Sequence, residues 1–317
     1  MSNIHQSCVY LGDALARYNF GEQHPFGPNR HHAFQQAFET LGLDKQVDVL
    51  DPATTSQQII ELFHTNDYVT KVIAQSKFGT GYLDKGDTPA FIGMYEAAST
   101  VVGTVINAID RLMNDEYKRA FIPIAGLHHA RRDIAAGFCV FNDCGIAIEY
   151  LRSRYNLKRV AYIDIDAHHG DGVFYSFESD ADLIFADFHE DGRYLYPGTG
   201  AITETGKGAA KDTKLNIPMP PKATDKEFNR IWPNVESYIR GNRPEFIILQ
   251  GGADSIQGDP ITDLAYSENT HAHVVKQCCA IADEYCNGKI LVLGGGGYNL
   301  DNIAKTWTAM VSSMVSC

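Results

Sequence analysis

The sequence is poor in basic residues for its length. Its 317 residues include 27 lysines and arginines against 39 aspartates and glutamates, so the formal net charge is −12. Proteins that bind nucleic acid through its phosphates need clustered lysine and arginine side chains. The acidic balance argues against non-specific nucleic-acid binding, and we expect no direct nucleic-acid partner.

Long apolar runs are also missing. The chain has no run of about 18 apolar residues, the length that a membrane-spanning helix requires. Residues 1–20 lack a basic stretch followed by an apolar one, which is the pattern of a secretory signal. We therefore expect no membrane association and a cytoplasmic location.

Cysteine is infrequent and follows no pattern. There are seven cysteines, an odd number, and no two of them form a C-x-x-C pair. Neither a disulfide framework nor a thiolate zinc finger is expected from this distribution. The thiols should instead pack as small apolar groups in a reducing compartment.

Apolar residues, by contrast, are plentiful. Hydrophobic residues make up 44% of the chain and aromatic residues 11%, enough to form a buried core. A chain of this length often holds two domains, but no linker, repeat or low-complexity segment divides it. We expect a single domain over residues 1–317.

Short apolar, β-branched runs alternate along the chain with longer segments of helical spacing. The predicted strands are residues 8–11, 120–125, 160–166, 183–187, 246–250 and 290–293. The predicted helices are residues 30–41, 56–63, 95–114, 143–154, 225–239, 267–286 and 302–315, and residues 197–214 are predicted to be a loop. Apolar strands separated by helices predict an α/β domain with a central, mostly parallel β-sheet and helices on both faces.

Polar residues follow four of these strands at their carboxyl ends. They are His128 and His129; Asp164, Asp166, His168 and Asp171; Asp254; and Tyr298. In open parallel sheets, ligands bind beyond the carboxyl ends of the strands. We therefore expect these side chains to converge on one rim and to form an active site.

Three of these residues are a typical set of metal ligands. Asp164, Asp166 and His168 alternate along the chain, so at a strand end they point the same way. Asp166, His168 and Asp254 would supply two oxygens and one nitrogen, and three protein ligands with an open position are typical of a catalytic divalent metal. The oxygen-rich set leaves zinc, Fe(II) and Mn(II) as candidates.

The other polar residues can supply acid–base groups. A metal-activated water needs a nearby base, and the adjacent His128 and His129 are candidates if a turn directs both towards the metal. Asp164 and Asp171 are the carboxylates available to orient the two imidazoles. Tyr298 follows four glycines, which permit close backbone approach, and its phenol is a neutral donor suited to an oxyanion.

At these residues the sequence closely resembles the zinc-dependent histone deacetylase family of the arginase/deacetylase superfamily. The similarity covers nearly the whole chain and is strongest to the class I branch and its bacterial relatives. The motifs that carry it are residues 24–25, 29–30, 63–68, 126–130, 137–143, 164–172, 196–200, 252–255 and 294–299.

The resemblance implies a role for each residue of the rim. Asp166, His168 and Asp254 would hold the zinc ion. His129 would be the general base and acid, oriented by Asp171. The reaction would be hydrolysis of an N-acetyl amide to acetate and a free amine.

The resemblance also implies supporting and substrate-binding groups. His128, backed by Asp164, would be the electrostatic partner of the base, and Tyr298 would polarise the acyl carbonyl and bind the oxyanion. The residues implied to contact substrate are Asp87, Gly137, Phe138, Tyr196, Ile261 and Gly296. Among these, Gly137, Phe138 and Tyr196 would line a narrow tunnel for the lysine methylenes. Ile261 would be an apolar residue at the rim, and Asp87 would be a rim aspartate that holds the substrate backbone.

Several substrates are compatible with this family. An acetyl-lysine in a protein or peptide is the leading expectation, because Ile261 and Asp87 favour it. Acetylpolyamines or other small amides, and lysines with longer acyl chains, are the alternatives. A ureohydrolase would need a second metal, and a catalytically silent binding module would be expected to lack a ligand or the tyrosine.

The family further implies two structural monovalent cations, expected to be potassium. The residues of the first site would be Asp164, Asp166, His168, Asp187 and Phe188. Class I members usually have serine where this chain has Asp187. The second site would use backbone carbonyls near Phe177, Asp180 and Leu183.

One feature of class I assemblies is not expected. Members bound to co-repressors hold an inositol phosphate through basic residues, whereas the matching positions here are Gly27, Pro260 and Asp301. None of these can neutralise a phosphate, so no inositol-phosphate co-repressor assembly is predicted.

Overall fold

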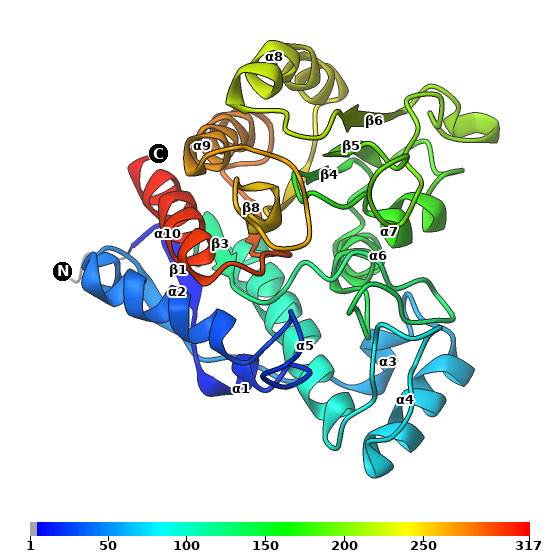
Figure 1. Ribbon diagram of the computed structural model, residues 1–317. Helices are drawn as coiled ribbons and strands as arrows, with labels where there is room; N and C mark the ends of the chain where they lie inside the picture. Colours follow the sequence, from blue (N-terminus) through cyan, green and yellow to red (C-terminus); the bar gives the residue numbers. More distant parts are fainter. Residues whose placement is uncertain (1–4) are drawn as a thin grey trace.

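The computed structural model describes residues 5–317 (Figure 1). Its centre is a sheet of eight strands in the order β2-β1-β3-β8-β7-β4-β5-β6, in which every neighbouring pair is parallel. The strands are β1 (Ser7–Tyr10), β2 (Asp48–Leu50), β3 (Arg119–Ile122), β4 (Val160–Asp164), β5 (Ile184–Glu190), β6 (Lys214–Met219), β7 (Phe246–Gln250) and β8 (Ile290–Leu293).

Helices cover both faces of this sheet. They are α1 (Asp13–Ala16), α2 (Asn29–Thr40), α3 (Gln57–Ile60), α4 (Asn66–Phe78), α5 (Met94–Met113), α6 (Asp143–Tyr155), α7 (Asp171–Ser176), α8 (Asp225–Asn242), α9 (Glu268–Tyr285) and α10 (Leu300–Ser316), with short 3-10 turns η1 (Leu43–Lys45), η2 (Gly208–Ala210) and η3 (Ala253–Ser255). Helices α2, α8, α9 and α10 pack together as one layer, and α3 to α7 form the other (Figure 1).

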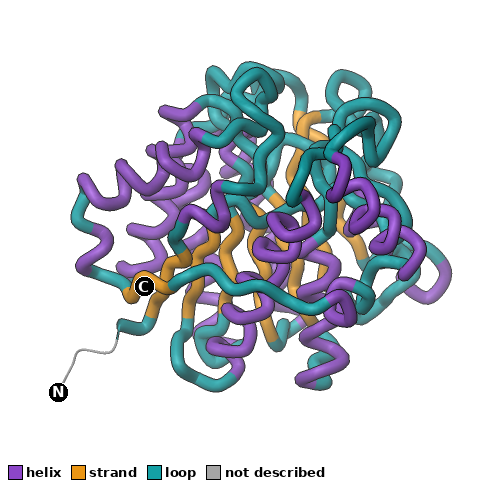
Figure 2. Tube along the Cα trace, turned by 90° about the horizontal axis from the view of Figure 1, so that it is seen from below, coloured by secondary structure: helices purple, strands orange, loops and turns teal. Residues whose placement is uncertain are grey.

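The central strands owe their position to their composition. Every residue of β3, β4, β5, β7 and β8 is buried. Strands that are apolar on both faces are stable only between two helical layers, because neither face can meet water without cost. The predicted parallel sheet with helices on both faces is confirmed. Figure 2 shows the strands side by side between helices, with loops gathered along one edge.

Helices α1, α4 and α7 and strands β2 and β6 were not predicted from the sequence. Helix α4 begins after Thr65, whose hydroxyl accepts from the backbone N–H of Tyr68, and ends at Gly79 in a left-handed conformation. Both are ordinary helix-end signals. Strand β6 begins at Lys214, where the predicted loop was expected to end, and lies at the edge of the sheet, where Pro218 is tolerated.

Within residues 5–317, no helix has both the length and the apolar character needed to cross a membrane.

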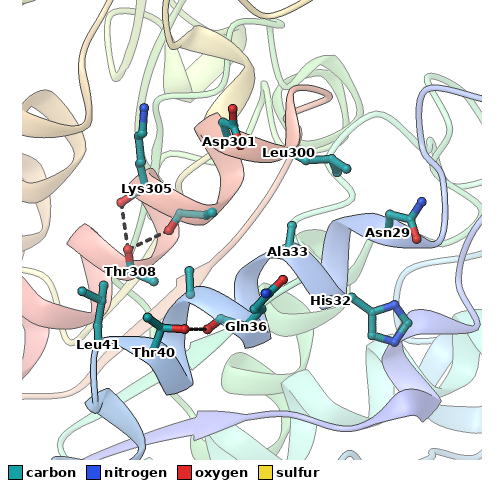
Figure 3. Close-up of a pocket in the computed structure, with 12 residues that line it drawn as sticks. Asn29, His32, Ala33, Gln36, Thr40, Leu41, Leu300, Asp301, Lys305 and Thr308 are labelled. Atoms are coloured by element: carbon teal, nitrogen blue, oxygen red, sulfur yellow. Dashed lines mark hydrogen bonds between the residues drawn. The ribbon is translucent and has the colours of Figure 1, made fainter.

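A groove of about 630 Å³ lies between α2 and α10, away from the polar residues at the strand ends (Figure 3). Its wall includes Asp301, one of the three positions at which inositol-phosphate-binding relatives carry basic residues. A carboxylate there repels a phosphate rather than attracting it.

Candidate active site

Four neighbouring strands direct their following loops to one place. Strands β3, β8, β7 and β4 are consecutive in the sheet, so the segments after them emerge side by side at the same edge. The loop after β3 carries both adjacent histidines, and the loop after β8 carries Tyr298. Asp254 lies in η3 after β7, and Asp166 and His168 follow β4. The predicted convergence of these side chains is therefore present in the structure.

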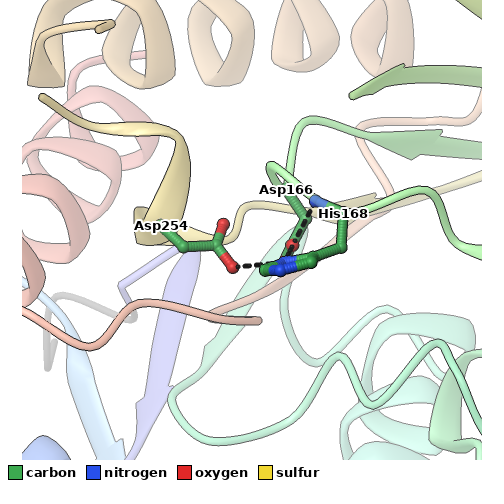
Figure 4. Close-up of side chains that lie close together, drawn as sticks. All are labelled: Asp166, His168 and Asp254. Carbon is green, nitrogen blue, oxygen red and sulfur yellow. Dashed lines mark hydrogen bonds and ion pairs between the residues drawn. The ribbon is translucent and has the colours of Figure 1, made fainter. Parts of the chain in front are cut away.

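Asp166, His168 and Asp254 form a compact buried cluster (Figure 4). The Nδ1 atom of His168 lies 3.2 Å from Asp166 Oδ1 and 3.1 Å from Asp254 Oδ2. One potential ligand atom from each residue lies within 4.8 Å of the others. Two carboxylate oxygens and one imidazole nitrogen at this spacing fit a divalent metal ion.

The charges of the cluster also favour a cation. Burial, followed by the neighbouring Asp166, raises the pKa of Asp254 to about 7. Burial lowers the pKa of His168, but hydrogen bonds to Asp166 and Asp254 outweigh it and raise the pKa to about 10. Two buried carboxylates, here those of Asp166 and Asp254, need a positive charge nearby to offset their mutual repulsion. A bound metal ion would supply that charge, and His168 could then remain a neutral imidazole.

Backbone groups and one amide side chain hold the ligands in place. Asp166 Oδ2 accepts from Gly296 N at 2.9 Å and from Gln250 Nε2 at 2.8 Å. Asp254 Oδ1 accepts from Ala167 N at 2.8 Å. These contacts leave Asp166 Oδ1 and Asp254 Oδ2 next to His168, and partners of this kind orient metal ligands.

Gly296 leaves space beside the cluster that no other residue would leave. A Cβ atom at this position would lie 2.1 Å from Asp254 Oδ2 and 2.8 Å from Asp166 Oδ2. Any side chain there would displace the ligand oxygens. The glycine run before Tyr298 therefore shapes the cluster directly.

The two adjacent histidines form a pair with two carboxylates behind them. His128 Nδ1 lies 2.7 Å from Asp164 Oδ2, and His129 Nδ1 lies 2.8 Å from Asp171 Oδ1. The two Nε2 atoms are 3.1 Å apart. Asn142 makes this possible, because its Nδ2 donates to the backbone carbonyl oxygens of His128 and Ala130 and so fixes the turn.

The pair is electrostatically asymmetric. Burial lowers the pKa of His128, but Asp164 and Asp166 outweigh it and raise the pKa to about 10. Burial, and then the charge on His128, lower the pKa of His129 to about 4. His129 is therefore the neutral imidazole: its Nδ1–H donates to Asp171, and its Nε2 is the unprotonated nitrogen that faces the Nε2–H of His128.

Two partners of these carboxylates were not predicted. The Tyr162 hydroxyl donates to Asp164 Oδ2 at 2.5 Å, and Arg131 Nη2 donates to Asp171 Oδ2 at 3.2 Å. Tyr162 lies two residues before Asp164 on β4 and so shares its face, which is a signal available in the sequence. The contact of Arg131 depends on the loop conformation and has no such signal.

A cavity of about 270 Å³ leads to this cluster. Its walls are Asp87, His129, Gly137, Phe138, His168, Leu195, Tyr196, Ile261 and Tyr298. All the predicted substrate-contacting residues except Gly296 therefore lie around one cavity, and Gly296 lines a smaller space directly behind it. Leu195 was not predicted.

Aromatic rings form much of the cavity wall. The ring of Phe138 lies 5.8 Å from that of Tyr298, and the ring of Tyr196 lies 5.2 Å from that of His129. Gly137 has a φ of +53°, and a Cβ atom there would lie 2.3 Å from His129 Cδ2. The wall can approach the base closely only because this residue is glycine.

The tyrosine is held so that its phenol remains protonated. Its backbone N–H donates to Asp259 Oδ2 at 2.8 Å. Burial, and then Asp254, raise the pKa of Tyr298 well above its ordinary value. A buried neutral phenol can donate a hydrogen bond to a developing oxyanion.

Asp87, in the wall of the cavity, has a second acidic residue beside it. Asp84 Oδ1 accepts from the backbone N–H groups of Gly86, Asp87 and Thr88 at 2.9 to 3.1 Å. Burial, and then a hydrogen bond and the charge from Asp84, raise the pKa of Asp87 to about 6. Asp84 itself lines an adjoining pocket together with Lys85 and Arg131, so this surface carries charges of both signs.

The first predicted potassium site contains buried carboxylates. Asp164 and Asp187 are paired residues on the parallel strands β4 and β5. Asp187 Oδ2 accepts from Gly170 N at 2.8 Å, and Asp187 Oδ1 lies 2.7 Å from His189 Nδ1. Buried carboxylate oxygens are donors that suit a cation, and although burial lowers the pKa of His189, the contact with Asp187 raises it.

The second predicted potassium site does not fit the structure. The carbonyl oxygens of Asp180 and Leu183 accept hydrogen bonds from the Lys214 ammonium, at 2.5 and 2.9 Å from Nζ. Burial lowers the pKa of Lys214 to about 8, which leaves the group mainly charged at neutral pH. A potassium ion cannot share these oxygens with an ammonium group, because their charges repel and the position is filled.

Comparisons with known proteins agree with this geometry. A family model described as the histone deacetylase domain matches residues 24–314. Acetoin utilization protein AcuC from Bacillus subtilis (strain 168) is 36% identical over 320 residues, covering 97% of this chain and 82% of that protein. AcuC from Staphylococcus xylosus is 30% identical over 325 residues, covering 99% of this chain and 84% of that protein.

A solved structure is similar in fold. The crystal structure of the HDA15 HD domain superposes with a TM-score of 0.90, covering 99% of this chain and 89% of that chain at 24% sequence identity. This likeness concerns the fold, whereas the family match and the AcuC identities concern the sequence itself. The chain belongs to the histone deacetylase family.

Proposed function

We propose that this protein is a zinc-dependent deacetylase that hydrolyses N-acetyl-lysine in proteins or peptides. The observation that carries the proposal is the cavity of about 270 Å³ that ends on His129, His168 and Tyr298. A base, a metal ligand and a phenol donor at the end of one narrow cavity are what hydrolysis of a buried amide requires.

Asp166, His168 and Asp254 would hold the metal, zinc or in its place Fe(II). Bound there, it would polarise the acyl carbonyl and lower the pKa of a water molecule. A potassium ion is proposed at the first monovalent site only, between Asp164 and Asp187.

The residues of the chain would move the protons. His129 Nε2 accepts a proton from the attacking water, while Asp171 retains the Nδ1–H and keeps the imidazole oriented. His129 then donates that proton to the departing amine nitrogen. The His128 imidazolium would stay charged through its hydrogen bond to Asp164, and its positive charge would stabilise the negative charge that develops on the oxygens of the transition state.

Tyr298 would stabilise the transition state rather than the substrate. Its phenol O–H donates to the former carbonyl oxygen, whose negative charge develops only as water attacks. Phe138, whose ring packs against Tyr298, and Tyr196, whose ring packs against His129, would exclude water from the alkyl part of the substrate and so strengthen this hydrogen bond.

The cavity supports an acyl-lysine because its walls are mainly aromatic and apolar, which suits a methylene chain. Ile261 at the rim gives no charge for a distal amine, and Asp87 can accept from a peptide N–H. A second candidate substrate is an acetylated polyamine. The adjoining pocket favours it, because Asp84 and Asp87 both line that pocket and two neighbouring carboxylates could hold a distal ammonium group.

The experiment compares three substrate classes on one purified holoenzyme of measured metal content. The substrates are an acetyl-lysine peptide, the same peptide with a longer acyl chain, and an acetylated polyamine, each assayed with and without a hydroxamate inhibitor. We expect the acetyl-lysine peptide to give the highest kcat/KM. If the folded, metal-loaded protein hydrolyses none of the three, the proposal is wrong. If the acetylated polyamine gives the highest kcat/KM, the polyamine and not acetyl-lysine is the substrate.

A reducing, cytoplasmic location is proposed from the thiols. All seven cysteines are free, and six of them are buried. Their dispersed positions support a protein that functions without disulfides.

A further inference from the structure

Lys214 places a charged group inside the protein. It is the first residue of the edge strand β6, which lies beside β5 (Figure 1). Only 1% of its surface is exposed. Its Nζ atom lies 2.5 Å from the carbonyl oxygen of Asp180, 2.9 Å from that of Leu183 and 3.0 Å from Thr213 Oγ1. Three N–H donors therefore have three acceptors.

These hydrogen bonds all go to uncharged oxygens. The carboxylate of Asp180 is engaged elsewhere, with Arg152 and with the backbone N–H groups of Asp182 and Leu183. A buried ammonium group most often pairs with a carboxylate, because removing a charge from water is costly. Lys214 is instead surrounded by carbonyl and hydroxyl oxygens, as a dehydrated monovalent metal ion would be.

The carbonyls concerned belong to one turn. Residues 177–183 connect α7 to β5, and the backbone N–H of Asp180 also donates to the carbonyl of Phe177. The turn therefore directs two carbonyl oxygens, those of Asp180 and Leu183, towards one position that a positive charge occupies. Both are oxygens at which the family resemblance implies a second potassium ion.

We propose that the Lys214 ammonium group permanently replaces the second monovalent cation of this family, so that the chain carries its own cation at the turn of residues 177–183. A side chain is suitable because the group only has to bind backbone oxygens and never has to exchange. It also ties β6 to the turn, whereas a free ion would join only the oxygens of the turn itself.

The turn follows a helix of the active site. Helix α7 begins at Asp171, whose Oδ1 lies 2.8 Å from His129 Nδ1, and ends directly before the turn that Lys214 holds. The proposal does not depend on the reaction, since it concerns which cations the protein binds.

The first test counts monovalent cations on the wild-type protein. Binding of thallium(I) or potassium to the metal-loaded protein, measured by calorimetry in choline chloride, should give no more than one ion per chain. Two ions per chain would overturn the proposal. This measurement needs no variant, so it decides the question even if a substituted protein does not fold.

The second test is chemical rescue. Lys214→Ala leaves a space among the carbonyls, and we expect its melting temperature in choline chloride to fall by at least about 2–4 °C relative to the wild type. Potassium or methylammonium chloride should restore the difference, and the variant should bind one ion more than the wild type. Lys214→Met fills the space with an apolar chain, so it should be destabilised without being rescued.

Lys207→Ala is the matched control. Lys207 lies seven residues earlier, has a side chain that is 69% exposed and pairs with Glu178 on the surface. Its variant should melt like the wild type and respond to salts in the same way. If Lys214→Ala also melts like the wild type in choline chloride, or if Lys214→Met is rescued equally by potassium, the proposal is wrong.

Discussion

Two buried clusters in this protein gather oxygen atoms around a positive charge, and they obtain that charge in different ways. The cluster at the ends of β4 and β7 uses the carboxylates of Asp166 and Asp254 with His168. The cluster beside the edge strand uses neutral carbonyls and the ammonium group of Lys214. The first opens into a cavity lined by His168, whereas the second is closed by Thr213 and a buried lysine stem.

The difference follows from what each charge has to do. A catalytic cation must keep an open position for water and substrate, which no side chain offers, and it therefore has to come from solution. A structural cation only has to satisfy backbone oxygens, and a lysine does this without depending on ion concentration. Loss of the first should affect activity, and loss of the second should affect stability.

The largest effect is expected from Asp254→Ala. It removes one of three ligands, so the protein should lose its metal. The value of kcat/KM should fall by a larger factor than the about 10²–10³-fold expected for loss of one oxyanion donor. The fold should persist, because removing a buried carboxylate next to Asp166 relieves like-charge repulsion. Metal analysis, kinetics and a melting curve on the same preparation test this.

Asp263→Ala serves as the control, because Asp263 lies nine residues after Asp254 in the sequence and its side chain is exposed. It should keep both metal and activity. Retention of a full equivalent of metal by Asp254→Ala would contradict the assignment of this cluster.

Tyr298→Phe should come next in magnitude. It removes only the phenol O–H, so kcat should fall by about 10²–10³ while metal content and melting temperature stay unchanged. This pattern would separate the oxyanion donor from the ligands of the same site. An unchanged kcat would remove Tyr298 from the mechanism.

Asp187→Asn tests the site that lies between the two clusters. Removing a buried negative charge beside Asp164 should weaken binding of the single expected monovalent cation by about tenfold, or about 1.4 kcal/mol. His189 offsets part of the charge of Asp187, which keeps the effect moderate. Thallium(I) titration measures it, and Lys214→Met should leave this affinity unchanged. Equal weakening in both variants would show that the two sites are not independent.

The last effect concerns the pH dependence of stability, and it comes from a buried base with no anionic partner. His64 accepts from Asn142 N at 2.9 Å, and burial lowers its pKa to about 3. Below about pH 6.5 the unfolded chain binds a proton at this residue and the native protein does not, so the free energy of unfolding decreases as the pH falls towards 3. His64→Gln should reduce this slope by up to about 1.4 kcal/mol per pH unit.

Urea unfolding between pH 7 and 5 measures that slope. Gln retains an acceptor for the backbone N–H of Asn142. A difference between the two proteins in the free energy of unfolding at pH 7 therefore measures the loss of packing, apart from the effect of protonation. Identical slopes for the two proteins would mean that His64 takes up its proton in the native state as well.

Much of the site could be predicted because its residues follow strands. A strand end determines where a side chain emerges, and alternation along β4 places Asp164 and Asp166 on one face. Helix α4 was missed although Thr65 and Gly79 mark its ends. Gln250 was missed as a partner of Asp166, although it is the last residue of a predicted strand and so lies at the same rim.

Other features depend on contacts between distant parts of the chain. Lys214 meets oxygens that lie 31 and 34 residues earlier, and this meeting depends on the parallel pairing of β5 with β6. A lysine at the end of a glycine- and threonine-rich segment has the local pattern of a solvated surface residue. The family resemblance therefore implied a potassium ion where the structure has an ammonium group.

The sequence by itself determined which chemical groups are available and in what order, because carboxylates, imidazoles and the phenol follow apolar strands that can only be stable in a parallel sheet. Only the tertiary structure decided the balance of charge: which imidazole is protonated, how acidic the rim is, and whether a carbonyl cluster binds an ion or a lysine. Those outcomes depend on distances of a few ångströms between side chains from separate elements, and no local pattern specifies such distances.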